Sequence, residues 1–419
     1  MTDIKELTKG IIGCECGRDH TCPIECVEIG SGVLNKITEL CAGYEKILLI
    51  ADRNTYGVCG AEVEKLLAGK VSEKVVFETG DKPLIPDEDA IARIEAVVNG
   101  QTELIVGVGS GVINDLCKHV SFVKGLPYYI VATAPSMDGY ASVGSALILK
   151  GMKVTLNARP PKAILADTRV LRDAPMDMLQ AGFGDIVGKY SCLNDWKLSA
   201  LINGEYLCKR VYDLTYETTQ RVETLAEGVV SRDETAVGAL MEALVVVGIA
   251  MSYMGNSRPA SGSEHHLSHF FEITGILDNQ PYFSHGIDVV YSAVATAALR
   301  EKILATEPHP FSHDAAAWEE EINRIYTTSA PEVIKLQNKM GWYDQADFET
   351  VSGRWEQIKE VLAEAPSAEQ MLAMVEKIGL DYSNFVELYG EKKIADALLY
   401  AKDLKDRYSV LWLNYMFCR

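Results

Sequence analysis

The sequence has few cationic residues for its length. Its 419 residues include 40 Lys and Arg against 59 Asp and Glu, so the formal net charge is -19 at pH 7. Such a surface repels polyphosphates, and a nucleic-acid partner would need a local basic patch, which the sequence lacks. We therefore expect no nucleic-acid partner. Small anions can still be bound by local groups.

Long apolar runs are also missing. The longest, such as ALVVVGIAM at 243–251, are too short to span a bilayer, and the first ten residues lack the charged-then-apolar pattern of a signal peptide. Five of the ten cysteines lie in apolar segments, as is typical of reduced, buried thiols: Cys41, Cys59, Cys117, Cys192 and Cys208. We expect a cytoplasmic protein without a membrane anchor.

Hydrophobic periodicity predicts two domains. Up to residue 172, apolar strand patterns at 46–52, 74–78, 103–109, 128–133 and 163–167 alternate with helical patterns at 60–69, 87–99 and 111–123. This alternation predicts a parallel, Rossmann-like α/β sheet over 1–172. Two alternating runs around Lys150 and Gly151, within 146–156, predict an inserted β-hairpin. Residues 173–419 show mainly helical periodicity, for example at 233–253, 261–274, 286–305 and 368–378, and are expected to form an all-α domain.

Two loops follow predicted strands at the edge where ligands bind in open α/β sheets. GVGSG at 107–111 ends a strand and begins a helix, so it is either a phosphate cradle or a simple tight turn. Val112 stands where the usual dinucleotide fingerprint has its third glycine. TAPSMDGYAS at 133–142 clusters hydroxyl groups with Asp138, and its alternative interpretation is an ordinary βα loop.

Histidines cluster in the second half of the chain. SGSEHHLSH at 261–269 pairs Ser261 with Glu264 at the capping-box spacing, which predicts that a helix begins at 261. His265 and His269 then lie one turn apart on one face, and His285 follows 16 residues later. Imidazoles with a carboxylate such as Asp185, in GFGD at 182–185, suit a divalent transition metal with an open position.

The N-terminal segment CECGRDHTCPIEC contains Cys14, Cys16, Cys22, Cys26 and His20. One intervening residue is a poor spacing for a structural zinc finger, so packing cysteines are favoured over a small metal site or a redox pair.

Taken in order, GVGSGVINDLCKH, ATAPSMDGYAS, GFGD, SGSEHHLSH and SHG resemble the superfamily of iron-dependent alcohol dehydrogenases and dehydroquinate synthase. Within it, the second and fourth segments are similar to the bacterial branch of the sn-glycerol-1-phosphate dehydrogenase family. The resemblance covers roughly residues 15 to 300. It implies a homo-oligomeric enzyme of phospholipid metabolism, a dimer or larger, that uses NAD(P)(H) and one divalent metal, zinc or nickel, with iron as a further option.

The resemblance also implies roles for individual residues. Asp185, His265 and His285 would bind the metal, although the neighbouring His266 leaves the choice between the two imidazoles open. Asp138 and His269 would be catalytic and would bind substrate together with Asp185. The implied NAD(P) contacts are Asp52, Gly111, Val112, Ile113, Asn114, Asp115, Thr133, Ala134, Pro135, Ser136 and Ser142.

The reaction implied is reversible reduction of dihydroxyacetone phosphate to sn-glycerol 1-phosphate, in which the metal polarises the C2 oxygen. For the substrate phosphate, the residues themselves suggest Arg258 and the N–H groups of a helix beginning at Ser261, against the alternative of a surface arginine. Three rival functions stay open: a glycerol dehydrogenase acting on an unphosphorylated polyol, a dehydroquinate-synthase-like cyclase, and a catalytically idle metal- and nucleotide-binding regulator.

Overall fold

The computed structural model describes residues 3–79, 84–149, 152–345 and 347–419. The chain forms two compact units: Met1–Ile186 with Thr224–Ser257, and Val187–Glu223 with Arg258–Arg419. The predicted boundary at residue 172 lies just after the last strand, whereas the units divide at Ile186 and a later segment returns to the first unit. Such a return depends on contacts between distant residues, which local periodicity does not encode.

The first unit is built on a parallel sheet whose six strands have the order β1-β8-β5-β4-β2-β3. These strands are β1 (Cys26–Gly30), β2 (Ile47–Asp52), β3 (Val71–Phe77), β4 (Leu104–Gly109), β5 (Tyr128–Ala132) and β8 (Ala163–Asp167). All except β1 coincide with predicted strands, so the α/β expectation is confirmed. β1 escaped prediction because its five residues are only half-buried and lack a continuous apolar run.

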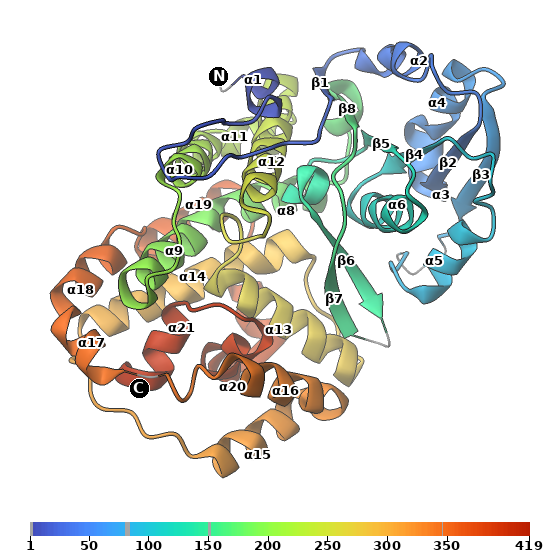
Figure 1. The fold of residues 1–419 in the computed structure, drawn as a ribbon. Coiled ribbons are helices and arrows are strands. Elements are labelled where there is room, and N and C mark those ends of the chain that lie inside the picture. Colours follow the sequence, from blue (N-terminus) through green and yellow to red (C-terminus); the bar gives the residue numbers. More distant parts are fainter. Residues whose placement is uncertain (1–2, 80–83, 150–151, 346) are drawn as a thin grey trace. The chain divides into compact units, whose positions relative to one another are not determined.

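Helices cover both faces of this sheet (Figure 1). Helix α6 packs against β2, β4 and β5, while η1, α2 and α4 share a buried apolar cluster with the opposite face. The helical segments of this unit are α1 (Ile4–Thr8), η1 (Val33–Asn35), α2 (Lys36–Leu40), α3 (Arg53–Thr55), η2 (Tyr56–Gly60), α4 (Ala61–Leu66), α5 (Glu88–Glu95), α6 (Gly111–Lys124), η3 (Asp138–Ala141), α7 (Thr168–Leu171), α11 (Ala226–Val230) and α12 (Glu234–Met254). Burial on both faces explains why the central strands are uniformly apolar.

Two glycines of β4 let α6 approach the sheet closely. A Cβ on Gly107 would stand 2.7 Å from Cys117 Sγ, and one on Gly109 would stand 2.6 Å from Ile113 Cβ. Both distances are shorter than side chains tolerate, so any larger residue would push the helix away. The first two glycines of GVGSG thus have a packing role.

The predicted hairpin is present as the antiparallel pair β6 (Gly144–Leu149) and β7 (Met152–Asn157). Its register pairs Gly144 with Asn157 and Leu149 with Met152. The predicted turn residues, Lys150 and Gly151, lie outside the described residues.

Helix α12 is the apolar core helix of the first unit. Asp233 caps its N-terminus by accepting a hydrogen bond from the Ala236 N–H at 2.8 Å, and Gly255 ends it with φ 67°. By length and composition alone it could cross a membrane, but 83% of its most apolar window is buried. It packs against α1, β1, α7 and η3 of its own unit, as a core helix of a globular protein does.

Among the described residues of the second unit, all regular secondary structure is helical, as predicted. Helix α8 (Met176–Val187) leads into it from the first unit. Its helical segments are α9 (Lys189–Asn203), α10 (Lys209–Glu223), α13 (Ser263–Asp278), α14 (His285–Leu304), α15 (Ala315–Tyr326), η4 (Thr327–Ser329), α16 (Ala330–Met340), α17 (Phe348–Gly353), α18 (Trp355–Ala363), α19 (Ala368–Lys377), α20 (Ser383–Tyr400), η5 (Ala401–Leu404), α21 (Val410–Leu413) and η6 (Asn414–Cys418). Helices α13 and α14 pack against each other at its centre.

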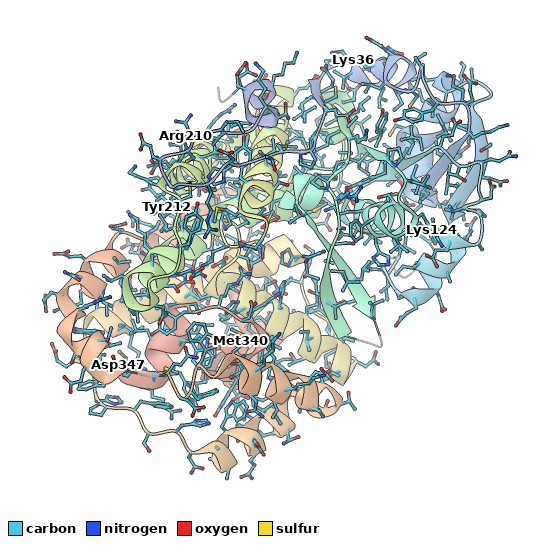
Figure 2. The ribbon with its side chains drawn as sticks, viewed as in Figure 1. Lys36, Lys124, Arg210, Tyr212, Met340 and Asp347 are labelled. Carbon is cyan, nitrogen blue, oxygen red and sulfur yellow. The ribbon has the colours of Figure 1, made fainter. Side chains whose placement is uncertain are left out.

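Several surface cations are paired with neighbouring acids. Lys36 and Lys124 are labelled in Figure 2. Lys36 Nζ lies 2.6 Å from a Glu28 carboxylate oxygen, and Lys124 Nζ lies 3.0 Å from one of Glu95. Such pairs contribute little stability, but they fit the absence of a basic patch in the sequence.

Candidate active site

The sheet of the first unit has a topological switch point between β2 and β4. From β2 the chain proceeds to β3 on one side, and then crosses to β4 on the other side. In open parallel sheets, ligands bind outside the carboxyl ends of the strands at this point. Asp52 ends β2 and Ser110 follows β4, so the predicted cofactor residues flank the expected crevice.

The N-terminus of α6 is suited to an anion. Its first backbone bond runs from the Asn114 N–H to the Ser110 carbonyl at 2.9 Å, which leaves the preceding N–H groups without partners inside the helix. A Cβ on Gly111 would meet Met137 Cγ at an ordinary 3.6 Å. Unlike Gly107 and Gly109, Gly111 therefore has no packing reason to be glycine. A bare backbone here fits close approach of a pyrophosphate.

Lys118 is a residue that the sequence analysis missed. It is fully buried, and its ammonium donates to the carbonyls of Gly139 at 2.7 Å and Gly144 at 2.9 Å and to Ser142 Oγ at 3.1 Å. Burial lowers its pKa to about 8, and burial raises the pKa of Asp115 to about 6. Its position three residues after Asp115, on the same face of α6, was the available signal.

Side chains predicted to contact the cofactor also hold the loop after β5. Asn114 is buried and its amide donates to the Gly139 carbonyl at 3.4 Å, while Ser142 Oγ donates to the same carbonyl at 3.0 Å. The Thr133 N–H donates to the Gly109 carbonyl at 3.2 Å, and the Ala134 carbonyl accepts from Tyr140 at 2.7 Å.

Pro135 and Ser136 continue this loop. A Cβ on Gly182 would stand 1.7 Å from the Pro135 carbonyl oxygen, so only glycine lets α8 lie against the loop at this point. Ser136 is half-buried next to it. Asp52 Oδ1 accepts a hydrogen bond from the Thr55 N–H at 2.9 Å, and the Asp52 N–H donates to Thr55 Oγ1 at 3.1 Å, which makes Asp52 the cap of α3.

Asp138 and Asp185 are brought together within the first unit. Asp185 is completely buried on α8, and its Oδ2 accepts a hydrogen bond from the Asp138 N–H at 2.9 Å. A Cβ on Gly248 of α12 would stand 2.8 Å from the Asp138 carbonyl oxygen. The loop is thus held between two helices, which fixes the position of both carboxylates.

Three predicted histidines converge within the second unit. The ring centroids of His265 and His285 lie 5.0 Å apart, those of His269 and His285 5.5 Å, and those of His265 and His269 6.2 Å. His265 and His269 come from successive turns of α13, and His285 is the first residue of α14. The packing of these two helices therefore assembles the cluster.

Glu264 orients the His265 ring. Its buried Oε1 lies 2.6 Å from His265 Nδ1 and accepts a hydrogen bond from the Gly262 N–H at 2.9 Å. A carboxylate at Nδ1 holds a metal-binding imidazole so that Nε2 faces the ion. By contrast, His266 is fully buried, and neither of its ring nitrogens has a hydrogen-bond partner among the described residues. This arrangement favours His265 over His266 as the ligand.

The predicted capping box at Ser261 is wrong. Helix α13 begins at Ser263, its N-cap is Gly262, and Glu264 is used at His265 instead. The Ser263 N–H donates to Asp195 Oδ2 at 2.6 Å. Gly262 lies so close to α9 that a Cβ would stand 2.5 Å from Cys192 Cα, and the helix begins two residues later than the spacing suggested. Carboxylates of Asp195 and Glu264 already occupy these two N–H groups, contrary to the prediction that they are free for a phosphate.

Arg258 is buried rather than a surface residue. Its Nη2 lies 2.9 Å from a Glu205 carboxylate oxygen and donates to the carbonyls of Asp195 at 3.0 Å and Tyr408 at 2.9 Å. An anion at this guanidinium would share it with Glu205.

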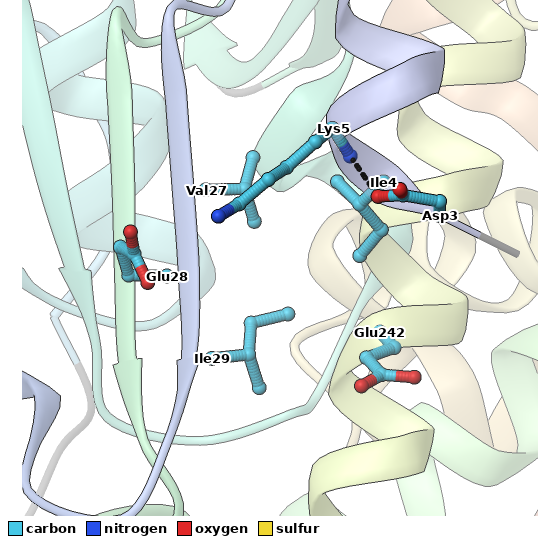
Figure 3. Close-up of a pocket in the computed structure, with 7 residues that line it drawn as sticks. All are labelled: Asp3, Ile4, Lys5, Val27, Glu28, Ile29 and Glu242. Atoms are coloured by element: carbon cyan, nitrogen blue, oxygen red, sulfur yellow. Dashed lines mark hydrogen bonds between the residues drawn. The ribbon is translucent and has the colours of Figure 1, made fainter. Parts of the chain in front are cut away.

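A separate pocket of the first unit contains none of the predicted residues. It has a volume of about 330 Å³ and is lined by Asp3 to Lys5 at the start of α1, residues 27–29 of β1 and Glu242 of α12 (Figure 3).

Comparison with known proteins identifies the family. A glycerol-1-phosphate dehydrogenase [NAD(P)+] from Bacillus licheniformis is 30% identical over 421 residues, covering 98% of this chain and 94% of that protein. One from Halalkalibacterium halodurans is 33% identical over 302 residues, covering 71% and 76% of the two chains. The chain belongs to the glycerol-1-phosphate dehydrogenase family. It is an oxidoreductase, as the resemblance implied.

Broader comparisons show similarity to iron-containing alcohol dehydrogenases. Residues 28–175 match the family described as iron-containing alcohol dehydrogenase. A sulfoacetaldehyde reductase from Bifidobacterium kashiwanohense, solved in complex with NAD+, has a TM-score of 0.61 at 15% identity and covers 95% of this chain and 97% of its own. A probable glycerol dehydrogenase from Sinorhizobium meliloti has a TM-score of 0.53 at 16% identity, covering 85% and 97%. These likenesses confirm the dehydroquinate-synthase-like fold.

Proposed function

We propose that this member of the glycerol-1-phosphate dehydrogenase family reversibly reduces dihydroxyacetone phosphate to sn-glycerol 1-phosphate with NAD(P)H and one divalent metal ion. The observation that carries the proposal is the cluster of His265, His269 and His285 with Glu264 at Nδ1 of His265. Oriented imidazoles of this kind are the usual ligands of divalent transition metals.

Asp185, His265 and His285 are the proposed metal ligands. Their donor set, one carboxylate and two imidazoles, fits a catalytic site with an open position for substrate. Zinc and nickel are the proposed metals, with iron as a further option.

When bound, the metal supplies a Lewis acid that polarises the ketone at C2. His269 would donate a proton to the C2 oxygen, directly or through a water, and bound NAD(P)H would supply the hydride for C2. The products would be the secondary alcohol and the oxidised cofactor. Asp138 binds a substrate hydroxyl beside Asp185. A positioned proton donor typically contributes about 10²–10⁴-fold to the rate.

The cofactor is proposed to lie at the switch point of the sheet. Its pyrophosphate would contact the backbone from Gly111 to Asp115, its adenosine ribose would approach Asp52, and the loop from Thr133 to Ser136 with Ser142 would line the remainder. The supporting observation is the bare backbone of Gly111 at the start of α6, which packing does not require.

Arg258 is proposed to hold the substrate phosphate. The side chain of its ion-pair partner Glu205 is 30% exposed, so solvent screens the attraction between these two groups. Removing this cation should weaken binding of the phosphorylated ketone selectively.

The deciding experiment is an assay of NADH and NADPH oxidation after chelation and reloading with Zn²⁺, Ni²⁺ or Fe²⁺. Dihydroxyacetone phosphate and dihydroxyacetone are compared, and chiral analysis identifies the product. We expect turnover of the phosphorylated ketone and its loss in His265→Ala. The matched control is His309→Ala, which removes an exposed imidazole. Faster turnover of dihydroxyacetone would instead establish a glycerol dehydrogenase, and inactivity with every metal would favour a binding regulator.

We further propose that the enzyme acts as a cytoplasmic homo-oligomer. Support for the reducing compartment comes from its ten cysteines, all of which are free thiols. Light scattering during size-exclusion chromatography measures the assembly state, and a monomer at micromolar concentration would contradict this proposal.

A further inference from the structure

The N-terminal cysteine segment folds into a tight loop within the first unit. Ile11 and His20 form an antiparallel bridge, with the Ile11 N–H donating at 2.8 Å and the His20 N–H at 2.9 Å. Between them the Gly17 N–H donates to the Cys14 carbonyl at 2.9 Å. Gly17 has φ 82°, a left-handed conformation that favours glycine, so the chain can reverse directly after Cys16.

This loop brings three metal-binding side chains together. The ligand atoms of Cys14, Cys16 and His20 all lie within 4.8 Å of one another, and Cys16 Sγ is 3.3 Å from His20 Nε2. In a tetrahedral zinc site, bonds of about 2.3 Å to sulfur and 2.0–2.1 Å to nitrogen place these two atoms about 3.6 Å apart. The observed separation is close to that value. The tight reversal compensates for the single residue between the two cysteines, which in sequence argued against a metal.

The His20 ring is oriented as metal-binding imidazoles are. Its side chain is almost completely buried, and Nδ1 lies 3.0 Å from the Tyr253 carbonyl oxygen. A carbonyl can only accept, so Nδ1 carries the proton and Nε2 presents its lone pair toward Cys16. A backbone carbonyl at the far nitrogen is a common way to fix the tautomer of a metal ligand.

We propose that Cys14, Cys16 and His20 bind a structural divalent ion of the zinc class, separate from the metal of catalysis. Binding replaces the thiol protons of both cysteines, so two thiolates and one neutral imidazole coordinate the ion and two protons are released. The ion would tie the N-terminal segment to the end of α12, where Tyr253 also donates from its hydroxyl to the Leu7 carbonyl. Structural zinc sites have four ligands, and the fourth is one of the other eight cysteines or a water.

Metal analysis of the intact enzyme tests the proposal. After loading with Zn²⁺ and desalting, elemental analysis should find two equivalents per chain in the wild type and one in Cys16→Ser and in His20→Asn. Cys41→Ser is the matched control, because it removes a buried thiol from the apolar core, and it should retain both equivalents. Unchanged stoichiometry in both loop variants would overturn the site.

Cobalt spectroscopy on the wild-type enzyme avoids dependence on the folding of variants. Loading with Co²⁺ should produce an intense near-ultraviolet thiolate-to-cobalt band together with tetrahedral visible bands. The proposed catalytic ligands include no sulfur, so this band reports the N-terminal site alone, and it should persist in Asp185→Ala. The band is expected whether or not the enzyme shows dehydrogenase activity, so failure of this site and failure of the proposed function give different results. Absence of a thiolate band in cobalt-saturated wild type would refute the proposal.

Discussion

Glu264→Gln gives a direct test of how the histidine cluster is prepared for a metal. The substitution preserves shape, and the amide oxygen can still accept from the Gly262 N–H, but the negative charge beside His265 Nδ1 disappears. Loss of an oriented partner of this kind typically lowers metal affinity 10–100-fold, which corresponds to about 1.4–2.8 kcal/mol. Because the contact is short and buried, we expect an effect in the upper half of that range.

Competition with a chromophoric chelator measures the affinity for the metal, and enzyme activity is measured at each point of the same metal titration. Saturating metal should restore most of the Glu264→Gln activity, because the variant retains all three proposed ligands. Glu320→Gln, which removes an exposed carboxylate on α15, is the control for loss of charge and should bind metal like the wild type. A folded Glu264→Gln variant with wild-type affinity would refute the orienting role of this carboxylate.

Three further predictions concern other parts of the site. Gly109→Ala should lower the free energy of unfolding by about 1–3 kcal/mol, because the added Cβ would strike Ile113. Gly111→Ala should leave the melting temperature near that of the wild type and raise KM for NAD(P)H. Equal losses of melting temperature in the two variants would contradict the distinction. Burial holds the pKa of Lys118 at about 8, below the ordinary 10.5, so the unfolded chain binds more protons and the free energy of unfolding should rise between pH 8 and 10.5. Lys118→Met should lack this rise in denaturant titrations. A variant with the same pH dependence as the wild type would contradict the assignment to Lys118. Arg258→Ala should raise KM at least tenfold for dihydroxyacetone phosphate and much less for dihydroxyacetone, and Arg258→Lys should recover part of this difference. Similar increases of KM for both ketones would assign this arginine to folding alone.

The central strands were predictable because burial on both faces demands continuous apolar runs. β2 and β4, for example, contain almost no polar residue before their last positions. β1 carries no such signal, and its place beside β8 depends on pairing with a segment more than 130 residues later in the chain. Local pattern therefore identifies the centre of this sheet better than its edge.

The convergence of the histidines was partly predictable. Spacing placed His265 and His269 on one face of a helix, whereas the approach of His285 depends on how α13 packs against α14. The role of Glu264 was assigned wrongly, because one carboxylate at that spacing suits both a helix cap and a neighbouring imidazole. Lys118 was missed because its partners are mainly backbone carbonyls, and its spacing from Asp115 does not by itself predict that the ammonium is buried.

The return of α12 to the first unit has a consequence for synthesis on the ribosome. The sheet-bearing part of the chain ends at Ile186, but the helix that completes its core ends only at Met254. At about 5–20 residues per second, the nascent sheet waits roughly 3–14 s for this helix after its own last residue is made. During that interval the surface of β1 and α7 that α12 later covers is exposed, and the emerging helix is itself strongly apolar. The growing polypeptide is therefore a natural client for ribosome-associated chaperones, and truncations that end before Met254 should aggregate.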